Sequence, residues 1–332
     1  MKSLSIIGGG SWGTALALVL SPRFERVRQW VYEPDLAARM RATRENDIYL
    51  PGYRLPGNVE VSSDLAAVVE DASTVLSVMP SHLVRGLYQQ MLPYLNESMA
   101  FVSATKGLEN GTLLRISEVI RQVVQNQFDP RVAVISGPTF AREVASGEPT
   151  ALVVASSDAR LAGEIQEAFS GRTFRLYTSQ DPIGVEIGGS VKNVVAIGSG
   201  VLRGLGLGHN VTAALITRGL AEMTRLAVAM GGRPLTLAGL AGLGDLVLTC
   251  TGDLSRNRTV GVKLAGGGKL DEIVSSMKMV AEGIKTTNAA VDLAQRFSVE
   301  MPIAGQMFQM LHFGVSPREA IQRLMERSLK GE

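Results

Sequence analysis

Short apolar runs alternate with segments of helical spacing from Leu4 to Thr178. The apolar runs predict strands over Leu4–Ile7, Val27–Tyr32, Val59–Val61, Ser73–Met79, Met99–Ala104, Val132–Ile135, Ala151–Ala155 and Phe174–Thr178. This alternation is typical of a doubly wound α/β domain with a mostly parallel sheet, and the last two strands are candidates for a mixed edge. The proline-glycine pairs at 51–52 and 56–57 predict a surface loop before the third strand.

The pattern changes beyond Pro182, where strand signals nearly vanish and helical periodicity dominates. We therefore predict an all-α second domain and place the two domains at residues 1–182 and 183–332. The first segment of this half, up to Leu205, is apolar enough to be buried. It contains Gly198, Gly200 and Gly204, and each glycine costs a helix about 1 kcal/mol relative to alanine. That cost indicates close approach to another element or to a ligand.

Composition narrows the function classes. The chain has 332 residues with 45% hydrophobic and 19% charged residues, which is typical of a globular protein with a sizeable core. A net charge of +2 is too small to indicate nucleic-acid binding. The single cysteine, Cys250, excludes an intrachain disulfide and suits the cytoplasm. The apolar runs are shorter than the roughly 18 residues that span a bilayer, so we expect no membrane insertion.

The segment Leu4–Leu20 combines a strand, a glycine turn and a helix start. Gly8, Gly10 and Gly13 have the G-x-G-x-x-G spacing of dinucleotide-binding turns, in which the phosphates lie at a helix N-terminus. Glu33 follows Gly13 by 20 residues, about where such folds place an acid that binds the ribose. The alternative is a secretory signal, which the glycine interruption and the lack of a small-residue cleavage site disfavour.

Four further stretches carry polar residues in apolar surroundings. Lys106 follows a predicted strand, at the sheet edge where ligands bind. Lys192 lies in a buried segment, where a lysine is rare unless it is paired or functional, although its stem can also extend to the surface. The third stretch, Ala238–Gly261, holds two candidate groups. Its Asp245 lies between glycines and an apolar run, where it needs a cationic partner. Ser255-Arg256-Asn257-Arg258 suits a phosphate, or else begins a solvated helix. The fourth stretch, Val280–Gly283, indicates little by itself.

The sequence lacks the residue patterns of metal sites, serine nucleophiles and phosphate-binding P-loops. His82, His209 and His312 form no paired spacing, and with one cysteine no metal-ligand pattern is present, so we expect no metal site. There is no G-x-S-x-G nucleophile turn and no P-loop. A dehydrogenase that uses lysine is the interpretation that remains.

Six blocks together resemble the bacterial NAD(P)-dependent sn-glycerol-3-phosphate dehydrogenases: GGGSWGTALA, SATKG, SGPTFAREVA, GGSVKNVVAIGSG, AGLGDLVLTCTGDLSRNRTVG and VAEGIKTT. The resemblance covers essentially the whole chain. It implies a Rossmann-like domain followed by an all-helical domain, as in the 6-phosphogluconate-dehydrogenase-like folds. It also implies reversible reduction of dihydroxyacetone phosphate to glycerol 3-phosphate for phospholipid synthesis.

The resemblance also implies a role for each matching residue. Lys192 is similar to the family's general acid/base, Lys106 to its partner at the substrate, and Asp245 to the carboxylate of that catalytic cluster. The implied substrate contacts are Lys106, Gly137, Thr139, Lys192, Asn193, Asp245, Thr249, Ser255, Arg256 and Asn257. The implied cofactor contacts are Gly8, Gly10, Ser11, Trp12, Gly13, Glu33, Lys106, Ala141, Arg256, Val280 and Glu282.

The choice between NAD and NADP stays open in the sequence. Many relatives carry a basic residue or histidine after the second strand, but this chain has Tyr32-Glu33-Pro34. Glu33 favours NAD because it repels a 2′-phosphate, whereas Arg39 and Arg41 are within reach of one. Two rival functions remain: a β-hydroxyacid dehydrogenase, and a non-catalytic redox sensor that binds a dinucleotide. The apolar helical domain also predicts a homodimer.

Overall fold

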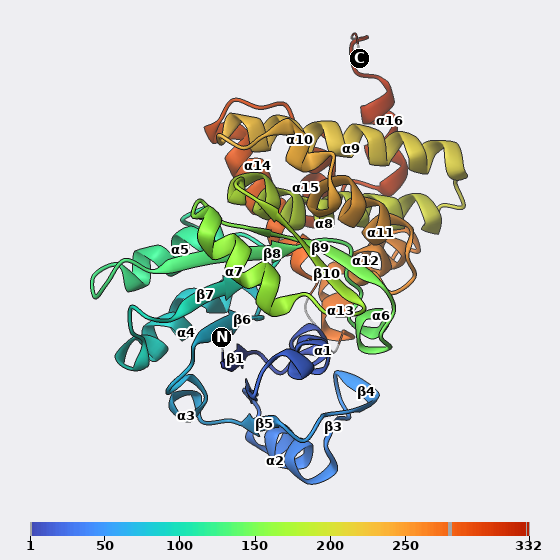
Figure 1. Cartoon of the computed structure of the whole chain (residues 1–332). Coiled ribbons are helices and arrows are strands. Elements are labelled where there is room, and N and C mark those ends of the chain that lie inside the picture. Colours follow the sequence, from blue (N-terminus) through green and yellow to red (C-terminus); the bar gives the residue numbers. More distant parts are fainter. Residues whose placement is uncertain (1, 278–280, 330, 332) are drawn as a thin grey trace.

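The computed structural model describes residues 2–277, 281–329 and 331, which form a sheet half and a helical half (Figure 1). In Figure 1 the sheet half, coloured blue to green, lies below the yellow-to-red helical half. Helix α8 (Pro182–Gly204) begins where the last strand of the sheet half ends. The predicted division between residues 182 and 183 therefore falls in the first turn of α8.

Eight strands of the described chain form one sheet in the order β10-β9-β8-β7-β6-β1-β2-β5. Their bounds are β1 Ser3–Ile7, β2 Arg26–Trp30, β5 Val59–Ser62, β6 Thr74–Ser77, β7 Ala100–Ser103, β8 Arg131–Ser136, β9 Thr150–Ala155 and β10 Phe174–Ser179. All neighbours pair in parallel except β8 and β9. This confirms the mostly parallel sheet and its mixed edge.

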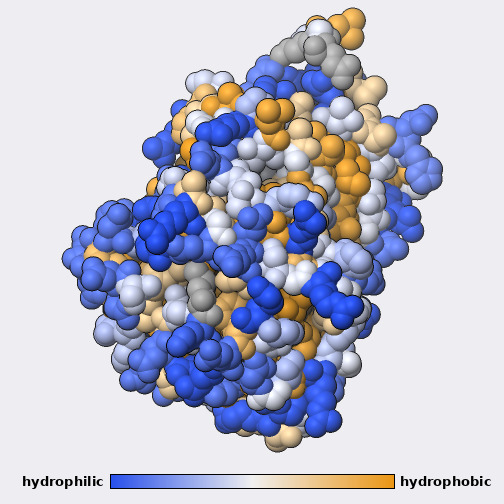
Figure 2. All heavy atoms as spheres, in the orientation of Figure 1, coloured by the Kyte–Doolittle hydropathy of each residue, from blue (hydrophilic) through white to orange (hydrophobic). Residues whose placement is uncertain are grey.

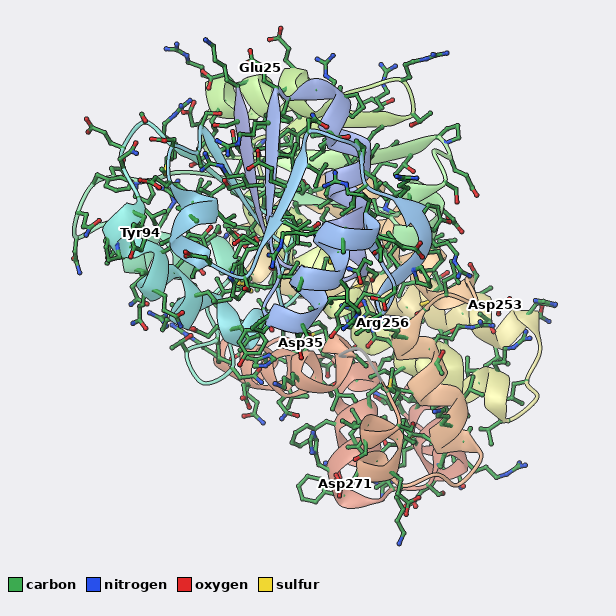
Figure 3. The ribbon with its side chains drawn as sticks, turned by 90° about the horizontal axis from the view of Figure 1, so that it is seen from below. Glu25, Asp35, Tyr94, Asp253, Arg256 and Asp271 are labelled. Carbon is green, nitrogen blue, oxygen red and sulfur yellow. The ribbon has the colours of Figure 1, made fainter. Side chains whose placement is uncertain are left out.

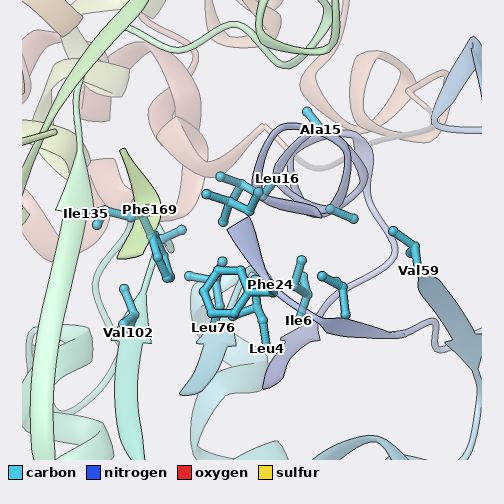
Figure 4. Packing of buried hydrophobic residues seen from close by; sticks show 14 of the residues in the cluster. Leu4, Ile6, Ala15, Leu16, Phe24, Val59, Leu76, Val102, Ile135 and Phe169 are labelled. Carbon is cyan, nitrogen blue, oxygen red and sulfur yellow. The ribbon is translucent and has the colours of Figure 1, made fainter. Parts of the chain in front are cut away.

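Helices cover both faces of this sheet, because successive strand residues point to opposite sides. Leu4 and Ile6 of β1 pack with Ala15 and Leu16 of helix α1 in one apolar cluster (Figure 4), whereas Ile7 belongs to a second cluster. The first face is covered by α1 Ser11–Leu20, α2 Pro34–Thr43, α6 Ala141–Ala145 and α7 Ala159–Phe169, and the second by α3 Leu65–Val69, α4 Val84–Met91 and α5 Ile116–Val124. The predicted doubly wound fold is confirmed.

The segment predicted as a surface loop contains a small hairpin instead. Strands β3 (Glu45–Asn46) and β4 (Leu50–Arg54) pair antiparallel apart from the main sheet. The proline-glycine pair at 51–52 lies within β4, and Gly52 has φ +90° there. The turn residues indicated a bend correctly, and in β3 Asn46, which pairs with Leu50, is fully buried.

The helical half is built around α8, which is buried along nearly its whole length. The helices that follow are α9 His209–Ala229, α10 Pro234–Leu237, α11 Asp245–Thr251, α12 Arg256–Ala265, α13 Leu270–Ser275, α14 Glu282–Arg296, α15 Pro302–Phe313 and α16 Pro317–Met325, with a π-helix at Leu240–Gly244. A Cβ on Gly200 would lie 1.9 Å from the Arg258 carbonyl oxygen on α12. The close approach predicted from the glycines is confirmed there, since only glycine lets the two helices touch.

One helical stretch, Pro234–Thr251, is long and apolar enough to cross a membrane by length and composition alone. The stretch reaches that length by its mean hydropathy and not as an uninterrupted apolar run, because Asp245 and three glycines lie within it. This stretch contains the buried carboxylate of Asp245, bound to two lysines, and a paired charge of this kind belongs in a protein interior. Leu237, Leu246 and Cys250 of this stretch pack in the apolar cluster of the helical half, and 39% of the stretch is buried.

Candidate active site

A cavity of about 780 Å³ lies between the sheet half and the helical half, within the size range of small-molecule sites. Its walls come from the ends of β1 and β7, the first turns of α1 and α6, and parts of α8, α11, α12 and α14. Ligands bind at this carboxyl edge in open parallel sheets. Figure 3 shows Arg256 at the boundary between the two halves.

The glycine turn after β1 forms one end of the cavity. Gly8 has φ +144°, and a Cβ there would lie 2.1 Å from the Val78 carbonyl oxygen. A Cβ on Gly13 would lie 2.2 Å from the Gly8 carbonyl oxygen, whereas Gly10 faces open space. Gly10 begins α1 without a side-chain cap, and Ser11 and Trp12 in the first turn line the cavity. The turn therefore presents a helix N-terminus to an anion.

Two lysines from different halves of the molecule converge on Asp245. Lys106 follows β7, and its Nζ lies 2.7 Å from Asp245 Oδ2. Lys192 lies on α8, and its Nζ lies 2.7 Å from Asp245 Oδ1. The Asp245 carboxylate is only 1% exposed. It therefore pairs with two ammonium groups in surroundings from which water is largely excluded. We call these three residues the lysine-aspartate cluster.

The two ammonium groups differ in how fully their donors are used. Lys106 Nζ also donates to the Gly137 carbonyl (2.7 Å) and to Thr139 Oγ1 (3.1 Å), which makes three partners. Lys192 Nζ has Asp245 and Thr249 Oγ1 (2.7 Å) as its partners among the described residues. An ammonium has three N–H donors, so Lys192 keeps one donor for the cavity.

Burial lowers the pKa of Lys106 to about 8. The Asp245 charge opposes this effect, and the neighbouring Lys192 ammonium adds to it. The Lys106 side chain is still 18% exposed toward the cavity. Its charge is therefore sensitive to pH near neutrality.

Amide and hydroxyl groups connect this cluster to the start of α12. Asn193 Nδ2 donates to the Lys106 carbonyl (3.4 Å), and its Oδ1 accepts from Asn257 Nδ2 (2.9 Å). Asn257 Oδ1 in turn accepts from the Gly283 N–H (2.9 Å). Ser255 caps α12 by accepting from the Arg258 N–H. Burial lowers the pKa of Arg256, and the Glu282 carboxylate partly offsets the effect.

The structure brings most of the sequence-predicted residues to this one cavity. Gly8, Gly10, Ser11, Trp12, Gly13, Glu33, Lys106, Thr139, Ala141, Lys192, Asn193, Asp245, Thr249, Ser255, Arg256, Asn257 and Glu282 all line it. Gly137 is not in the lining, and its contribution is the carbonyl that accepts from Lys106. Val280 lies outside the described residues. Glu282 accepts from the Ser81 N–H (3.1 Å) and hydroxyl (2.8 Å), which ties α14 to the sheet half.

Sequence reasoning missed two residues of the β3–β4 hairpin. Asn46 Nδ2 donates to the Gly9 carbonyl and to Thr14 Oγ1, both at 2.8 Å. Tyr49 lines the cavity, and its hydroxyl donates to Glu33 Oε1 at 2.7 Å. The turn-rich composition around Pro51 concealed both residues, because no local pattern marks a side chain that reaches a distant carbonyl.

Metal and thiol chemistry find no support among the described residues, where no group of three metal-ligating side chains comes together. Cys250 is 1% exposed, and burial raises the pKa of its thiol to about 12, which makes it unreactive. His82 lines the cavity, and burial lowers its pKa.

Comparison with known families matches both halves. A model described as the N-terminus of NAD-dependent glycerol-3-phosphate dehydrogenase matches residues 3–162, and one described as its C-terminus matches residues 181–322. A relative in Koribacter versatilis, named as an NAD(P)+ glycerol-3-phosphate dehydrogenase, is 56% identical over 98% of each chain.

Solved structures give the same result. The crystal structure of glycerol-3-phosphate dehydrogenase from Coxiella burnetii superposes with a TM-score of 0.93 at 42% identity, over 98% of this chain and 99% of that one. The yeast glycerol-3-phosphate dehydrogenase from Saccharomyces cerevisiae has a TM-score of 0.82 at 25% identity, over 98% of this chain and 99% of that one. The similarity thus extends over both halves and the cavity between them.

Proposed function

The chain belongs to the NAD-dependent glycerol-3-phosphate dehydrogenase family, and on this premise we propose how its residues reduce dihydroxyacetone phosphate reversibly to sn-glycerol 3-phosphate. It is an NAD(P)-dependent oxidoreductase of that family. The observation that carries our assignment of roles is the lysine-aspartate cluster at the cavity, in which Lys192 keeps one N–H donor.

Lys192 is the proton donor in this proposal. Reduction of a ketone places negative charge on the carbonyl oxygen, and a positioned acid must neutralise it. Lys106 has all three donors engaged, so its role is to hold charge and position beside the substrate. Lys192 can point its remaining N–H at the substrate oxygen. In the reverse direction the neutral amine accepts the proton from the alcohol.

Asp245 and Thr249 position Lys192. Asp245 Oδ1 binds the ammonium directly, and the Thr249 hydroxyl donates to the Asp245 carbonyl at 2.6 Å while accepting from Lys192. This geometry leaves the lysine stem little freedom. A donor held in place lowers the entropic cost of reaching the reactive geometry.

The substrate phosphate belongs at the start of α12. Ser255, Arg256 and Asn257 line the cavity at the N-terminus of this ten-residue helix. Backbone N–H groups, the helix dipole and a guanidinium all favour a phosphate. A phosphate held there places the carbonyl of a three-carbon ketone toward the lysine-aspartate cluster, to which Asn257 is linked through Asn193.

The cofactor fits the glycine turn, because the space beside Gly10 is open and Gly8 and Gly13 leave no room for a side chain. Gly8, Gly10, Ser11, Trp12 and Gly13 would hold the pyrophosphate, Glu33 the ribose, and Ala141, Arg256 and Glu282 the part nearer the substrate. When bound, the nicotinamide supplies the hydride. The protein's residues orient the ketone, exclude water and hold the proton at Lys192 Nζ.

A wider role rests on the same reaction. We propose that the product supplies phospholipid synthesis, that the chain works in the cytoplasm, and that it forms a homodimer. Figure 2 shows hydrophobic residues on the surface of the helical half. The exposed apolar side chains of this half include Leu207, Val211 and Val228. Light scattering of the purified chain tests the dimer, and a monomer mass would refute it.

Cell fractionation tests the compartment, and glycerol dependence of a deletion strain tests the role in phospholipid synthesis.

Lys192→Ala is the decisive experiment. We expect turnover of dihydroxyacetone phosphate, followed by the absorbance of the reduced cofactor, to fall by about 10² to 10⁴-fold, since a positioned proton donor contributes that much. NADH binding stays unchanged. Lys263→Ala serves as a matched control, because Lys263 is an exposed lysine on α12.

The alternatives predict other results. A β-hydroxyacid dehydrogenase would oxidise NADH with an unphosphorylated acid and not with dihydroxyacetone phosphate. A redox sensor would bind the cofactor without turnover. Near-normal activity of the Lys192→Ala variant would refute the role of Lys192.

A further inference from the structure

Ser81 and Gly107 lie side by side, just beyond the carboxyl ends of two neighbouring parallel strands. Ser81 follows β6, and Gly107 follows β7. A Cβ on Gly107 would lie 2.8 Å from Ser81 Cβ and 2.8 Å from Glu282 Oε2. The glycine after Lys106 therefore lets a side chain of the helical half reach the sheet half at this point. Ser81 is only 2% exposed and does not line the cavity.

The Glu282 carboxylate uses both of its oxygens on Ser81. Oε1 accepts from the Ser81 N–H at 3.1 Å, and Oε2 accepts from the Ser81 hydroxyl at 2.8 Å. Hydrogen bonds to an ionised acceptor are stronger than those between neutral groups. Because Glu282 is the first residue of α14, these two bonds fasten the start of that helix to the end of β6.

A second series of hydrogen bonds runs from the start of α14 back to the sheet half. The Gly283 N–H donates to Asn257 Oδ1 at 2.9 Å. Asn257 in turn donates to Asn193, whose amide donates to the Lys106 carbonyl. A Cβ on Gly283 would lie 2.7 Å from the Asn193 carbonyl oxygen, so this junction is closely packed as well.

Together the two series form a closed circuit across the boundary between the halves, because Lys106 is bonded to Gly107 and Glu282 to Gly283. We call this circuit the bridging ring. Its members are Ser81, Lys106, Gly107, Asn193, Asn257, Glu282 and Gly283.

The two halves carry different parts of the site. In the proposed function the glycine turn of the sheet half holds the cofactor, whereas α12 holds the substrate phosphate and α8 carries Lys192. The lysine-aspartate cluster also spans the boundary, since Lys106 comes from the sheet half and Asp245 from the helical half. The separation of the halves therefore sets the distances between the reacting groups, and a displacement of about 1 Å can cost about 10²-fold in rate.

We propose that the bridging ring holds the two halves at the separation that the reaction requires, with Ser81 as a positioning residue that acts through Glu282. This inference rests on the proposed function, because it concerns the arrangement of that site. It gives a role in the reaction to a residue that does not line the cavity.

Ser81→Ala is the first test, since it removes the hydroxyl and keeps the backbone N–H. We expect kcat for dihydroxyacetone phosphate to fall by about 3- to 30-fold, because the reacting groups are no longer held in place. NADH affinity should stay the same, because Ser81 touches no part of the cavity. Trp12 and Trp30 line the cavity, so this affinity is followed by quenching of tryptophan fluorescence.

Hydrogen exchange of the Gly283 amide in the unliganded protein is the second measurement. This amide lies on the other side of Glu282 from Ser81 in the bridging ring. We expect its exchange to become at least about threefold faster in Ser81→Ala, since local opening governs exchange. This result does not depend on turnover.

Gly107→Ala tests the same junction by adding a Cβ where Ser81 and Glu282 meet. We expect kcat to fall in this variant too, with circular dichroism showing that the fold persists. The combined Ser81→Ala/Gly107→Ala variant should lose less than the sum of the two single effects in ln kcat, because both changes act on one contact.

Ser98→Ala is the matched control. Ser98 is an exposed serine of the sheet half whose hydroxyl donates to Asn96, so kcat and Gly283 exchange should both stay unchanged. Normal kcat of folded Ser81→Ala would overturn the proposal, even if its unfolding temperature were lower, because that is the result for a purely structural contact. A fall in kcat without faster Gly283 exchange would also overturn it.

Failure of the proposed function gives a different result. In that case the unmodified chain does not turn over dihydroxyacetone phosphate, and the exchange rate of the Gly283 amide decides alone. Faster exchange in Ser81→Ala would then support the bridging ring, and unchanged exchange would refute it.

Discussion

Among the residues that the structure describes, two buried ion networks join the sheet half to the helical half, and they differ in how completely their donors are satisfied. In the first, Lys106 and Lys192 meet Asp245 at the cavity. In the second, Arg115 before α5 meets Glu186 of α8 at 2.6 Å. Both networks pair charges that are largely removed from water, and both lie between residues distant in the sequence.

The second network is closed. Glu186 accepts from the Ser117 N–H (2.8 Å) and hydroxyl (2.6 Å) as well as from Arg115, and the other side of the Arg115 guanidinium binds Glu118. In the first network Lys192 lines the cavity, and one of its three N–H donors has no partner among the described residues. A satisfied network holds a structure together, and one with a spare donor can act on a substrate. Replacing one carboxylate of each network by the corresponding amide tests this difference.

Asp245→Asn should produce the largest effect. The variant removes the charge that holds both ammonium groups, so we expect kcat to fall by about 10² to 10⁴-fold. The measurement is steady-state kinetics with dihydroxyacetone phosphate, beside far-ultraviolet circular dichroism to show that the fold persists. A folded variant with kcat within a few-fold of normal would contradict the assignment of the first network to catalysis.

Glu186→Gln should act on stability instead. Arg115 would lose its buried partner, which costs about 3 kcal/mol in free energy of unfolding, at the low end for such losses because Glu118 remains. Urea unfolding measures this change, and kcat of the folded fraction should stay the same. A fall in kcat with unchanged stability would show that the second network also serves the site.

The pH profile gives the smallest effect. Because the pKa of Lys106 is lowered to about 8, its ammonium is present below that pH and is lost as the pH rises through it. We expect kcat/KM for dihydroxyacetone phosphate to fall by up to about tenfold per pH unit above 8. Lys106→Arg retains its charge, so its remaining activity should fall only at higher pH. If kcat/KM falls at the same pH in both proteins, the titrating group is not Lys106.

The sequence predicted site residues that belong to local motifs better than it predicted contacts between distant segments. Gly8, Gly10 and Gly13 could be recognised because the turn they make is local. Lys106 could be placed at the sheet edge because strand ends follow from periodicity. Asn46 and Tyr49 could not be found in this way. Asn46 binds a carbonyl 37 residues away, and no pattern in the intervening residues records that contact.

By itself, the sequence determined the elements and the kinds of side chain available: a mostly parallel sheet, a helical half, two lysines, one aspartate and an arginine-asparagine pair. Tertiary structure decided how these groups share their hydrogen bonds. Gly137 and Thr139 accept the two N–H donors of Lys106 that Asp245 does not use. Thr249 accepts from Lys192, which still has one N–H donor left. The Tyr49 hydroxyl donates to Glu33. The physical reason is that a donor's remaining capacity depends on which acceptors reach it, and here those acceptors come from segments far apart in the chain.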